Sequence, residues 1–323
     1  MMAAYAVRAD AEAPLNALIV GHIEPPDVPS GWVPVQVKAA ALNHHDIWSL
    51  RGVGLPADRL PMILGCDAAG VTGDGREVIV HAVINAPDFT GSDGTYDPAR
   101  SLLSERYPGT FATQVRVPVA NLVDKPPELG FAEAACLPTA WLTAYRMLFS
   151  QSGARPGDTV LIQGAGGGVS TALTALGRQA GMRIWVTSRD ELRGARAVSV
   201  GAHQAFPIGA RLPERVDAVM ETVGAATWSH SINALKPGGT LVICGATSGD
   251  HPSKAELTKI FFKPLRVHGS TMGTREELIT LSKMLVTTGI RPHIDRVLPL
   301  VDAAAGFAAM IAGDHFGKII FQP

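Results

Sequence analysis

The sequence of 323 residues is poor in cysteine, balanced in charge and free of long apolar runs. Its three cysteines, Cys66, Cys136 and Cys244, lie far apart, which excludes a disulfide framework and is typical of a reducing compartment. Lys and Arg (28) nearly equal Asp and Glu (29) without a cluster of either sign, which argues against a nucleic-acid or membrane-surface partner. No stretch has the length of a membrane span, and the first residues lack a signal-peptide pattern. We predict a cytoplasmic, soluble protein.

The length predicts about two domains, and a hydrophobic content of 46% is enough for substantial cores. Residues 1–125 read as short strands separated by turns, which predicts a β-rich domain. In residues 126–268 strands alternate with helices, which predicts a doubly wound parallel sheet. Residues 269–323 are expected to finish that sheet and to return to the first domain through a final strand at 317–321.

A glycine-rich loop between a strand and a helix is the strongest motif in the chain. An apolar run over 159–163 ends at a loop whose residues, with the first of the helix, are Gly164, Ala165, Gly166, Gly167, Gly168 and Val169. Loop amides and the helix N-terminus would then face a diphosphate, as in a dinucleotide site. If Gly164 and Gly167 fill the first two glycine roles, Ser170 stands where a third glycine is usual. The alternative interpretation is a flexible connector.

The end of the next strand indicates which nucleotide binds. An NAD site usually has an acidic residue there, whereas this chain has Thr187, Ser188 and Arg189. Hydroxyls and a guanidinium suit a 2′-phosphate, which predicts NADPH. Asp190 is the competing residue, because a strand end one or two residues later would favour NADH.

Several sequence blocks occur in one order: AALNHHDIWSLRGVG, PMILGCDAAG, GTFATQVRVP, CLPTAWLTAYRML and GAGGGV. With VDAVMETVG, LKPGGTLVICGATSG, GSTMG and the closing FGKIIF, nearly the whole chain resembles the medium-chain dehydrogenase/reductase superfamily, and within it the zinc-independent quinone oxidoreductase branch. The resemblance implies an α/β protein in which a GroES-like catalytic domain precedes a Rossmann domain. It also implies a homodimer.

The resemblance bears directly on metal binding. Zinc-dependent relatives hold the metal with a Cys, a His and a third ligand, often Cys, and the matching positions here are Asn43, Cys66 and Thr139. One soft ligand out of three does not hold zinc, and residues 85–109 lack the four cysteines of the second metal site. We therefore predict no metal. A site improvised from neighbouring His, Asp and Cys side chains is the alternative.

The same match implies a catalytic set of Asn43, Asp46, Trp48 and Cys66. Asn43 would replace the metal ligand and bind the substrate oxygen or the nicotinamide, or it would merely cap the following helix. Asp46 also fits the first turn of that helix, where the dipole favours a carboxylate. Trp48 fits a pocket aromatic or a core residue, and Cys66 fits the site or an apolar filler.

Further nucleotide contacts are implied outside the glycine loop. They come from a helix near Pro138, from loops after later strands and from the last strand: Thr139, Thr222, Val223, Gly245, Ala246, Thr247, Met272, Gly273 and Lys318. Each has an ordinary alternative, such as a hydroxyl cap for Thr139, plain turns for the two loops and a surface position for Lys318.

The resemblance implies an NADPH-dependent reductase of quinones or α,β-unsaturated carbonyl compounds. In the absence of zinc, hydrogen-bond donors must stabilise the charge that hydride transfer places on the acceptor oxygen, and Asn43 is the leading donor. Conjugated acceptors suit this arrangement because they delocalise the charge. The alternatives are a medium-chain alcohol dehydrogenase and an NADPH-binding protein without turnover.

Overall fold

The computed structural model describes all residues from 1 to 323, which divide into two compact units. The first unit comprises Met1–Leu142 and Met272–Pro323, and the second comprises Thr143–Thr271. No helix in either unit combines the length and the apolar character that crossing a membrane requires.

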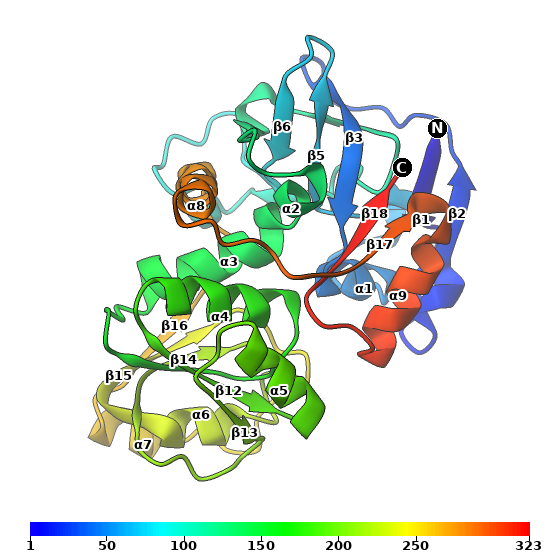
Figure 1. The fold of residues 1–323 in the computed structure, drawn as a ribbon. Helices are drawn as coiled ribbons and strands as arrows, with labels where there is room; N and C mark the ends of the chain where they lie inside the picture. Colours follow the sequence, from blue (N-terminus) through cyan, green and yellow to red (C-terminus); the bar gives the residue numbers. More distant parts are fainter. The chain divides into compact units, whose positions relative to one another are not determined.

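The first unit is built on mainly antiparallel sheets (Figure 1). Its strands are β1 (Met2–Ala6), β2 (Leu18–His22), β3 (Val33–Ala41), β4 (Met62–Ile63), β5 (Asp67–Thr72), β6 (Glu77–Val80), β7 (Val83–Ile84), β8 (Ser101–Leu102), β9 (Gln114–Val117), β10 (Leu122–Asp124), β17 (Ile294–Pro299) and β18 (Lys318–Gln322). The largest sheet has the order β10-β6-β5-β3-β18-β17, with β9 also on β3. Its helices are α1 (His44–Leu50), α2 (Phe131–Ala135), α8 (Arg275–Thr288) and α9 (Ala303–Ala312).

The last strand belongs to the first unit. β18 pairs antiparallel with β3, with Ile320 opposite Ala41. Three buried rings fix the strand from the core side, because Phe321 meets Phe111 at 5.1 Å between ring centroids and stacks with Phe307 at 6.1 Å. Residues near the two ends of the sequence, such as Ala4 and Phe321, therefore lie in one hydrophobic core, although β1 and β18 belong to different sheets.

The second unit is the predicted doubly wound parallel sheet. Its strands are β11 (Thr159–Ile162), β12 (Arg183–Ser188), β13 (Gln204–Pro207), β14 (Val216–Glu221), β15 (Leu235–Ile243) and β16 (Arg266–Gly269). They run parallel in the order β13-β12-β11-β14-β15-β16, which places a switch point between β11 and β14. Figure 1 shows α4 (Gly168–Gln179) and α5 (Glu191–Ser199) on one face and α6 (Trp228–Ala234) and α7 (Leu257–Phe262) on the other.

The division between the units falls inside a helical segment and not at residue 125. α2 packs on β3 and β5, so residues 126–142 belong with the first unit. The helix expected near Pro138 is largely π-helical, over Leu137–Trp141 and Arg146–Gln151, with one α-helical turn, α3 (Leu142–Tyr145), between them. Such turns are rare and often mark functional segments.

The return of β18 generates a prediction about Gly317, which precedes it. Its φ is +97°, and a Cβ there would run into the carbonyl oxygen of His293. We expect Gly317→Ala to lower the stability of the first unit by about 2 kcal/mol and its Tm by about 4 to 8 °C, measured by thermal denaturation. Gly21→Ala is the control, because nothing lies within 4 Å of a Cβ at that position. Equal melting temperatures for the two variants would contradict this account.

Candidate active site and nucleotide site

The glycine loop follows β11 and leads directly into α4. Gly164 and Gly166 have left-handed φ values of +82° and +92°, which explains the need for glycine at both positions. Gly167 is the N-cap with φ −75°, so the left-handed second glycine is Gly166 and not Gly167. Gly168 and Val169 form the first turn, whose free N–H groups provide the anion site of a helix N-terminus.

The third glycine of a dinucleotide site allows the helix to pack closely on the strand, and two residues share that role here. Ser170 is buried and donates its hydroxyl to the Gly167 carbonyl at 3.0 Å, which closes the first turn of α4. The close approach of helix to strand occurs at Gly177, where a Cβ would lie 2.5 Å from Cδ1 of Ile184 on β12. The sequence showed Gly177 but gave no sign of its contact, because the contact depends on the angle at which α4 crosses the sheet.

The loops after β14 and β15 are joined to each other. The backbone N–H of Ser248 donates to the Val223 carbonyl at 2.7 Å, and the Thr247 hydroxyl donates to the Thr222 carbonyl at 3.4 Å. At Gly224, with φ +93°, a Cβ would lie 2.7 Å from Cα of Ala246. A Cβ on Gly245 would lie 3.2 Å from the Thr222 carbonyl. The two predicted contact segments thus form one surface at the carboxyl ends of the strands.

A buried carboxylate organises this surface, and the sequence analysis did not identify its role. Glu221 is completely buried and accepts from the backbone N–H of Val223 at 2.8 Å and of Gly224 at 3.0 Å. The hydroxyls of Thr227 and Ser231 complete its shell at 2.9 and 2.6 Å. Glu221 therefore fixes the turn that carries Thr222 and Val223.

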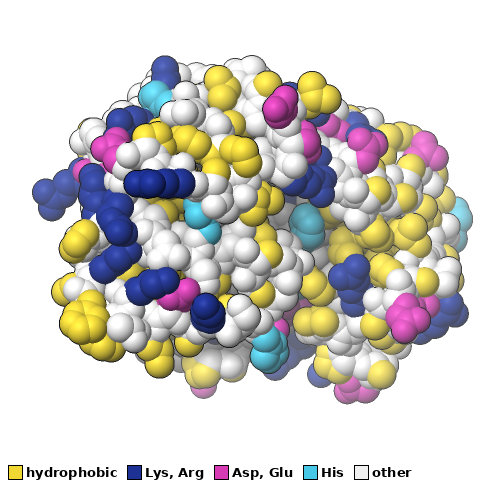
Figure 2. Space-filling model, turned by 90° about the horizontal axis from the view of Figure 1, so that it is seen from below, with side chains coloured by type: hydrophobic (Ala, Val, Ile, Leu, Met, Phe, Trp, Pro, Cys, Tyr) yellow, Lys and Arg dark blue, Asp and Glu magenta, His cyan; other side chains and the backbone are white.

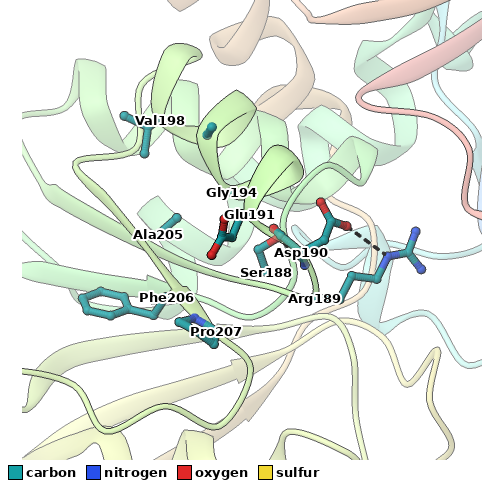
Figure 3. Close-up of a pocket in the computed structure, with 10 residues that line it drawn as sticks. Ser188, Arg189, Asp190, Glu191, Gly194, Val198, Ala205, Phe206 and Pro207 are labelled. Atoms are coloured by element: carbon teal, nitrogen blue, oxygen red, sulfur yellow. Dashed lines mark hydrogen bonds and ion pairs between the residues drawn. The ribbon is translucent and has the colours of Figure 1, made fainter.

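The end of β12 opens onto a cavity of about 370 Å³ (Figure 3). Arg189 and Asp190 lie on one side of it and Phe206 and Pro207 on the other, with Ser188 between them. β12 ends at Ser188, whose hydroxyl donates to the Asp190 carbonyl at 2.7 Å. The strand thus ends where the sequence placed it.

Asp190 acts as the N-cap of α5. Its carboxylate accepts from the backbone N–H of Arg193 at 2.7 Å. The Arg193 guanidinium reaches the glycine loop, donating to the Ala165 carbonyl at 3.5 Å, and its Nε lies 3.9 Å from Asp190. Arg189, with 57% of its side chain exposed, lies at the same distance from Asp190. Arg193 was not predicted, although an arginine in the first turn of the helix after this strand was a visible signal.

In the first unit, the predicted site residues Asn43, Thr139 and Lys318 meet Asp67 in one buried polar cluster. Lys318 on β18 is 2% exposed and donates to Oδ1 of Asn43 at 2.6 Å, to the Leu42 carbonyl at 2.8 Å and to Asp67 at 3.4 Å. Asp67 also accepts from the amide of Asn43 at 2.9 Å and from the hydroxyl of Thr139 at 2.5 Å. Lys318 is therefore not on the surface, and all three of its donors are used within the protein.

The Asn43 side chain does not cap α1. Its amide nitrogen donates to Asp67 and to the Ala41 carbonyl at 3.1 Å, so both of its hydrogens are engaged within the protein. The backbone cap comes instead from Asp46, whose Oδ2 accepts from the N–H of Asn43 at 2.9 Å and whose Oδ1 accepts from the N–H of Gly65 at 3.0 Å. Burial raises the pKa of Asp67, against the opposing effects of Lys318, Asn43 and Thr139.

A second cluster lies beside the first, around the fully buried Cys66. The Nδ1 of His45 lies 3.3 Å from the Cys66 sulfur, and its Nε2 lies 3.0 Å from Oε1 of Glu105. The thiol donates to the Leu103 carbonyl at 3.2 Å, and burial raises its pKa. Burial disfavours the charged form of His45, but Cys66, Asp46 and Glu105 together raise its pKa well above the usual range. Glu105 and the pairing of His45 were missed by the sequence analysis.

The remaining predicted residues are placed as follows. Trp48 on α1 is half-buried, with the Arg51 guanidinium 5.2 Å from its ring. Met272 is buried and has a left-handed φ of +50°, unusual for a side chain of this size. The carbonyl of Gly273 lies 2.9 Å from Nε2 of His81. Met272 and Gly273, which precede α8, hold its start against the first unit.

Cations that are separate in sequence lie together around α6 and α7. Arg215 and Lys263 both donate to carbonyls at the end of α6, including that of Leu235. Burial, Arg215 and Lys259 lower the pKa of Lys263, which indicates that the charges interact. Figure 2 shows Lys and Arg side chains gathered with apolar side chains on this face. On this surface the cations stabilise the C-terminal end of α6.

Two family models match the sequence. Residues 168–287 match a family described as zinc-binding dehydrogenase, and residues 29–127 match one described as alcohol dehydrogenase GroES-like domain. A crotonyl-CoA carboxylase/reductase of Cereibacter sphaeroides is 28% identical over 97% of this chain and 85% of its own length. An acryloyl-coenzyme A reductase of Metallosphaera sedula is 26% identical over 93% of this chain and 95% of its own.

Two further similarities involve proteins named as alcohol dehydrogenases. A zinc-type alcohol dehydrogenase-like protein YogA of Leptosphaeria maculans is 30% identical over 89% of this chain and 89% of its own length. A crystal structure of an NAD-dependent alcohol dehydrogenase superposes with a TM-score of 0.90 at 30% identity and covers 100% of both chains.

The buried Lys318 cluster generates a stability prediction. Lys318→Met should cost about 3 to 5 kcal/mol, because it leaves Asp67 without its cation, and adding Asp67→Asn should recover part of the loss. We expect a coupling energy of about 1 kcal/mol or more in a double-mutant cycle measured by urea unfolding. Lys283→Met, at an exposed position on α8, is the matched control and should cost little. Strictly additive effects at positions 318 and 67 would refute the coupling.

Proposed function

The chain belongs to the medium-chain dehydrogenase/reductase superfamily of oxidoreductases, and on that premise we propose that it is an NADPH-dependent reductase of α,β-unsaturated carbonyl compounds or quinones. The reduction proceeds by hydride transfer without catalytic zinc. The observation that carries the proposal is the buried ammonium of Lys318, 2.6 Å from Asn43 at the centre of the polar cluster.

The second unit supplies the nucleotide site. The helix N-terminus at Gly167–Val169, with the left-handed Gly164 and Gly166 before it, presents N–H groups to a diphosphate. The surface held by Glu221, which carries Thr222 and Val223, is assigned to the nicotinamide half, together with Gly245, Ala246 and Thr247. Bound NADPH would supply the hydride, and the protein residues bind and orient it.

The choice of NADPH over NADH rests on the end of β12. Asp190 is engaged in capping α5, which makes it a poor acceptor for a ribose 2′-hydroxyl. Ser188, Arg189 and Arg193 place a hydroxyl and two guanidinium groups around the cavity mouth and the glycine loop. Two cations suit a 2′-phosphate of nearly two negative charges. One similar solved structure is named as an NAD-dependent alcohol dehydrogenase, so the preference for NADPH over NADH needs a direct test.

Zinc does not fit the residues at the three positions that would hold it. Asn43 accepts from an ammonium group, the Thr139 hydroxyl donates to Asp67, and only Cys66 offers a soft ligand. A divalent ion there would meet a buried positive charge, and like charges repel strongly away from water. The possible ligand atoms of His45, Asp46 and Cys66 lie within 4.8 Å of one another, but both Asp46 oxygens accept from backbone N–H groups, and burial raises the pKa of the Cys66 thiol, which disfavours the thiolate that binds metal.

Without a Lewis acid, the acceptor must carry its own means of delocalising charge. An enone, an enoyl thioester or a quinone does so, whereas a simple ketone does not. Two relatives named as reductases of crotonyl-CoA and acryloyl-CoA act on acyl groups of this conjugated kind. The alcohol dehydrogenase names of other relatives keep a saturated alcohol as the second candidate substrate.

Asn43 and Lys318 act in this proposal by positioning. Lys318 and Asp67 fix the Asn43 amide, and Thr139 is tied to the same carboxylate. Because both hydrogens of the Asn43 amide are engaged, Asn43 is not a free donor to the acceptor oxygen, and the cluster acts through the fixed dipoles and charges of its members.

A homodimer formed through β16 is part of the proposal. β16 is an edge strand of the six-stranded sheet, and its Val267 is 40% exposed. Phe261 and Phe262 on α7 are 63% and 75% exposed, an apolar surface next to an unpaired strand edge. Pairing of the β16 edges of two subunits would cover both the unpaired strand edge and the apolar surface beside it.

The function is tested by NADPH oxidation against a panel of quinones, enals, enones, enoyl thioesters and saturated ketones, with and without a metal chelator. We expect turnover of conjugated acceptors, little of saturated ketones, no loss in chelator and no stoichiometric zinc by elemental analysis. One zinc per chain, with activity lost on its removal, would overturn the zinc-free proposal. Tight NADPH binding without turnover of any acceptor would indicate that the protein binds NADPH but is not a reductase.

Cofactor choice is tested at Arg189. Charge-assisted hydrogen bonds contribute roughly 1.5 to 3 kcal/mol, so Arg189→Ala should weaken NADPH binding by about 10- to 100-fold and NADH binding much less. Titration of the purified protein with each nucleotide measures both constants. Arg211→Ala, an exposed arginine in the same unit, is the control and should change neither. Equal losses for both nucleotides would show that Arg189 does not contact the 2′-phosphate.

A further inference from the structure

We propose that Gln163 is a positioning residue for NADPH, whose side chain couples the glycine loop to the turn held by Glu221, so that both halves of the nucleotide meet one surface. This inference rests on the proposed nucleotide site, in which the loop binds the diphosphate and the turn faces the nicotinamide half. Gln163 directly follows β11 and precedes Gly164, at the switch point where β11 and β14 lie side by side. Its side chain is completely buried.

The amide oxygen of Gln163 reaches the glycine loop through Thr187. The Thr187 hydroxyl donates to Oε1 of Gln163 at 2.7 Å, and its oxygen accepts from the backbone N–H of Gly164 at 3.0 Å. Thr187 is completely buried on β12, so its hydroxyl serves the loop and is not available to a 2′-phosphate. A side chain of the neighbouring strand therefore orients the peptide at which the left-handed turn of the loop begins.

The amide nitrogen of Gln163 reaches the Glu221 turn through Ser231 on α6. Nε2 of Gln163 donates to the Ser231 oxygen at 2.9 Å, and the Ser231 hydroxyl donates to Oε2 of Glu221 at 2.6 Å. Oε1 of the same carboxylate accepts from the backbone N–H groups of Val223 and Gly224. One continuous series of hydrogen bonds, the Gln163 chain, thus runs through Gly164, Thr187, Gln163, Ser231 and Glu221.

The partners of the Gln163 amide fix its orientation. A carboxylate only accepts, so the Ser231 hydrogen is on Glu221 and the serine oxygen must accept from Nε2 of Gln163. The second Nε2 hydrogen is on Nδ1 of His230 at 2.8 Å, and Nε2 of that ring donates to the Ala210 carbonyl at 2.9 Å. Every donor of the Gln163 chain therefore points toward the Glu221 charge, an arrangement in which each bond strengthens the next.

The position of the Gln163 chain indicates that it serves the loops more than the sheet. The parallel ladder already joins β11 to β12 and to β14, and the chain lies at the carboxyl ends of these strands, where the loops begin. The loops also touch directly, because the Thr222 hydroxyl donates to the Gln163 main-chain carbonyl at 3.1 Å. A Cβ on Gly164 would lie 3.1 Å from Cγ2 of Val223. A shift of one loop therefore displaces the other.

The test measures binding, by calorimetric titration with NADPH and with 2′-phospho-ADP-ribose, which lacks the nicotinamide. Ser231→Ala cuts the Gln163 chain on the side of the nicotinamide, yet we expect it to weaken both ligands by about 5- to 50-fold, because the released Gln163 no longer holds Thr187 and the glycine loop. Thr187→Val cuts the chain on the loop side. It should also reduce the affinity that NADPH gains over 2′-phospho-ADP-ribose, which comes from the nicotinamide half.

A double-mutant cycle adds a second readout. The losses of NADPH affinity caused by Ser231→Ala and Thr187→Val should be less than additive, because the second substitution cuts a chain that is already broken.

Ser152→Ala and Thr174→Val are the matched controls. Each removes a buried hydroxyl of the second unit, one that donates to the Leu148 carbonyl and one that donates to the Ser170 carbonyl within α4. They should lower the midpoint of urea unfolding about as much as the test substitutions do, and they should leave both dissociation constants nearly unchanged.

The outcomes separate this inference from the proposed reductase activity. A Ser231→Ala variant that binds NADPH more weakly but 2′-phospho-ADP-ribose as the wild type does would overturn the coupling. Additive losses in the cycle, or losses no larger than those of the controls, would overturn it as well. Wild-type protein that turns over no acceptor would end the reductase proposal without changing either binding constant. Wild-type protein that does not bind NADPH would end the nucleotide assignment and this inference with it.

Discussion

The ion pair and hydrogen bonds of Lys318 are the interaction on which the first unit depends. The ammonium is almost completely buried, and it joins the last strand, through Asn43 and Asp67, to the start of α1 and the start of β5. A buried charge without partners costs several kcal/mol, so the cluster is stable only when all its members are present. The pairing of β18 with β3 and the stacked Phe307 and Phe321 hold it in register.

In the proposed function, that same cluster determines the chemistry. The Lys318–Asp67 ion pair occupies the polar centre that zinc would require, so the electrostatic help proposed for an acceptor comes from groups of the protein itself. Such help suits acceptors whose charge is spread over a conjugated system. The neighbouring His45 is held between the Cys66 sulfur and Glu105.

The second unit follows a different physical logic, because its site is made mostly of backbone. The glycine loop, the turn held by Glu221 and the loop around Gly245 all leave the carboxyl ends of parallel strands. Their glycines are required either by left-handed φ or by the absence of room for a Cβ, as at Gly224. Side chains become decisive only at the end of β12, where Ser188, Arg189 and Arg193 surround the mouth of a cavity or reach the glycine loop.

The sequence by itself determined the features that local patterns encode. Alternating strands and helices predicted the doubly wound sheet, the glycine spacing located the loop before α4, and the residue types at positions 43, 66 and 139 argued against a metal. Tertiary structure alone decided the contacts. Lys318 meets Asn43 although 275 positions separate them, and Glu105 meets His45 across 60. The physical reason is that strand register and helix packing set which distant side chains face each other, and residue spacing along the chain carries no record of either.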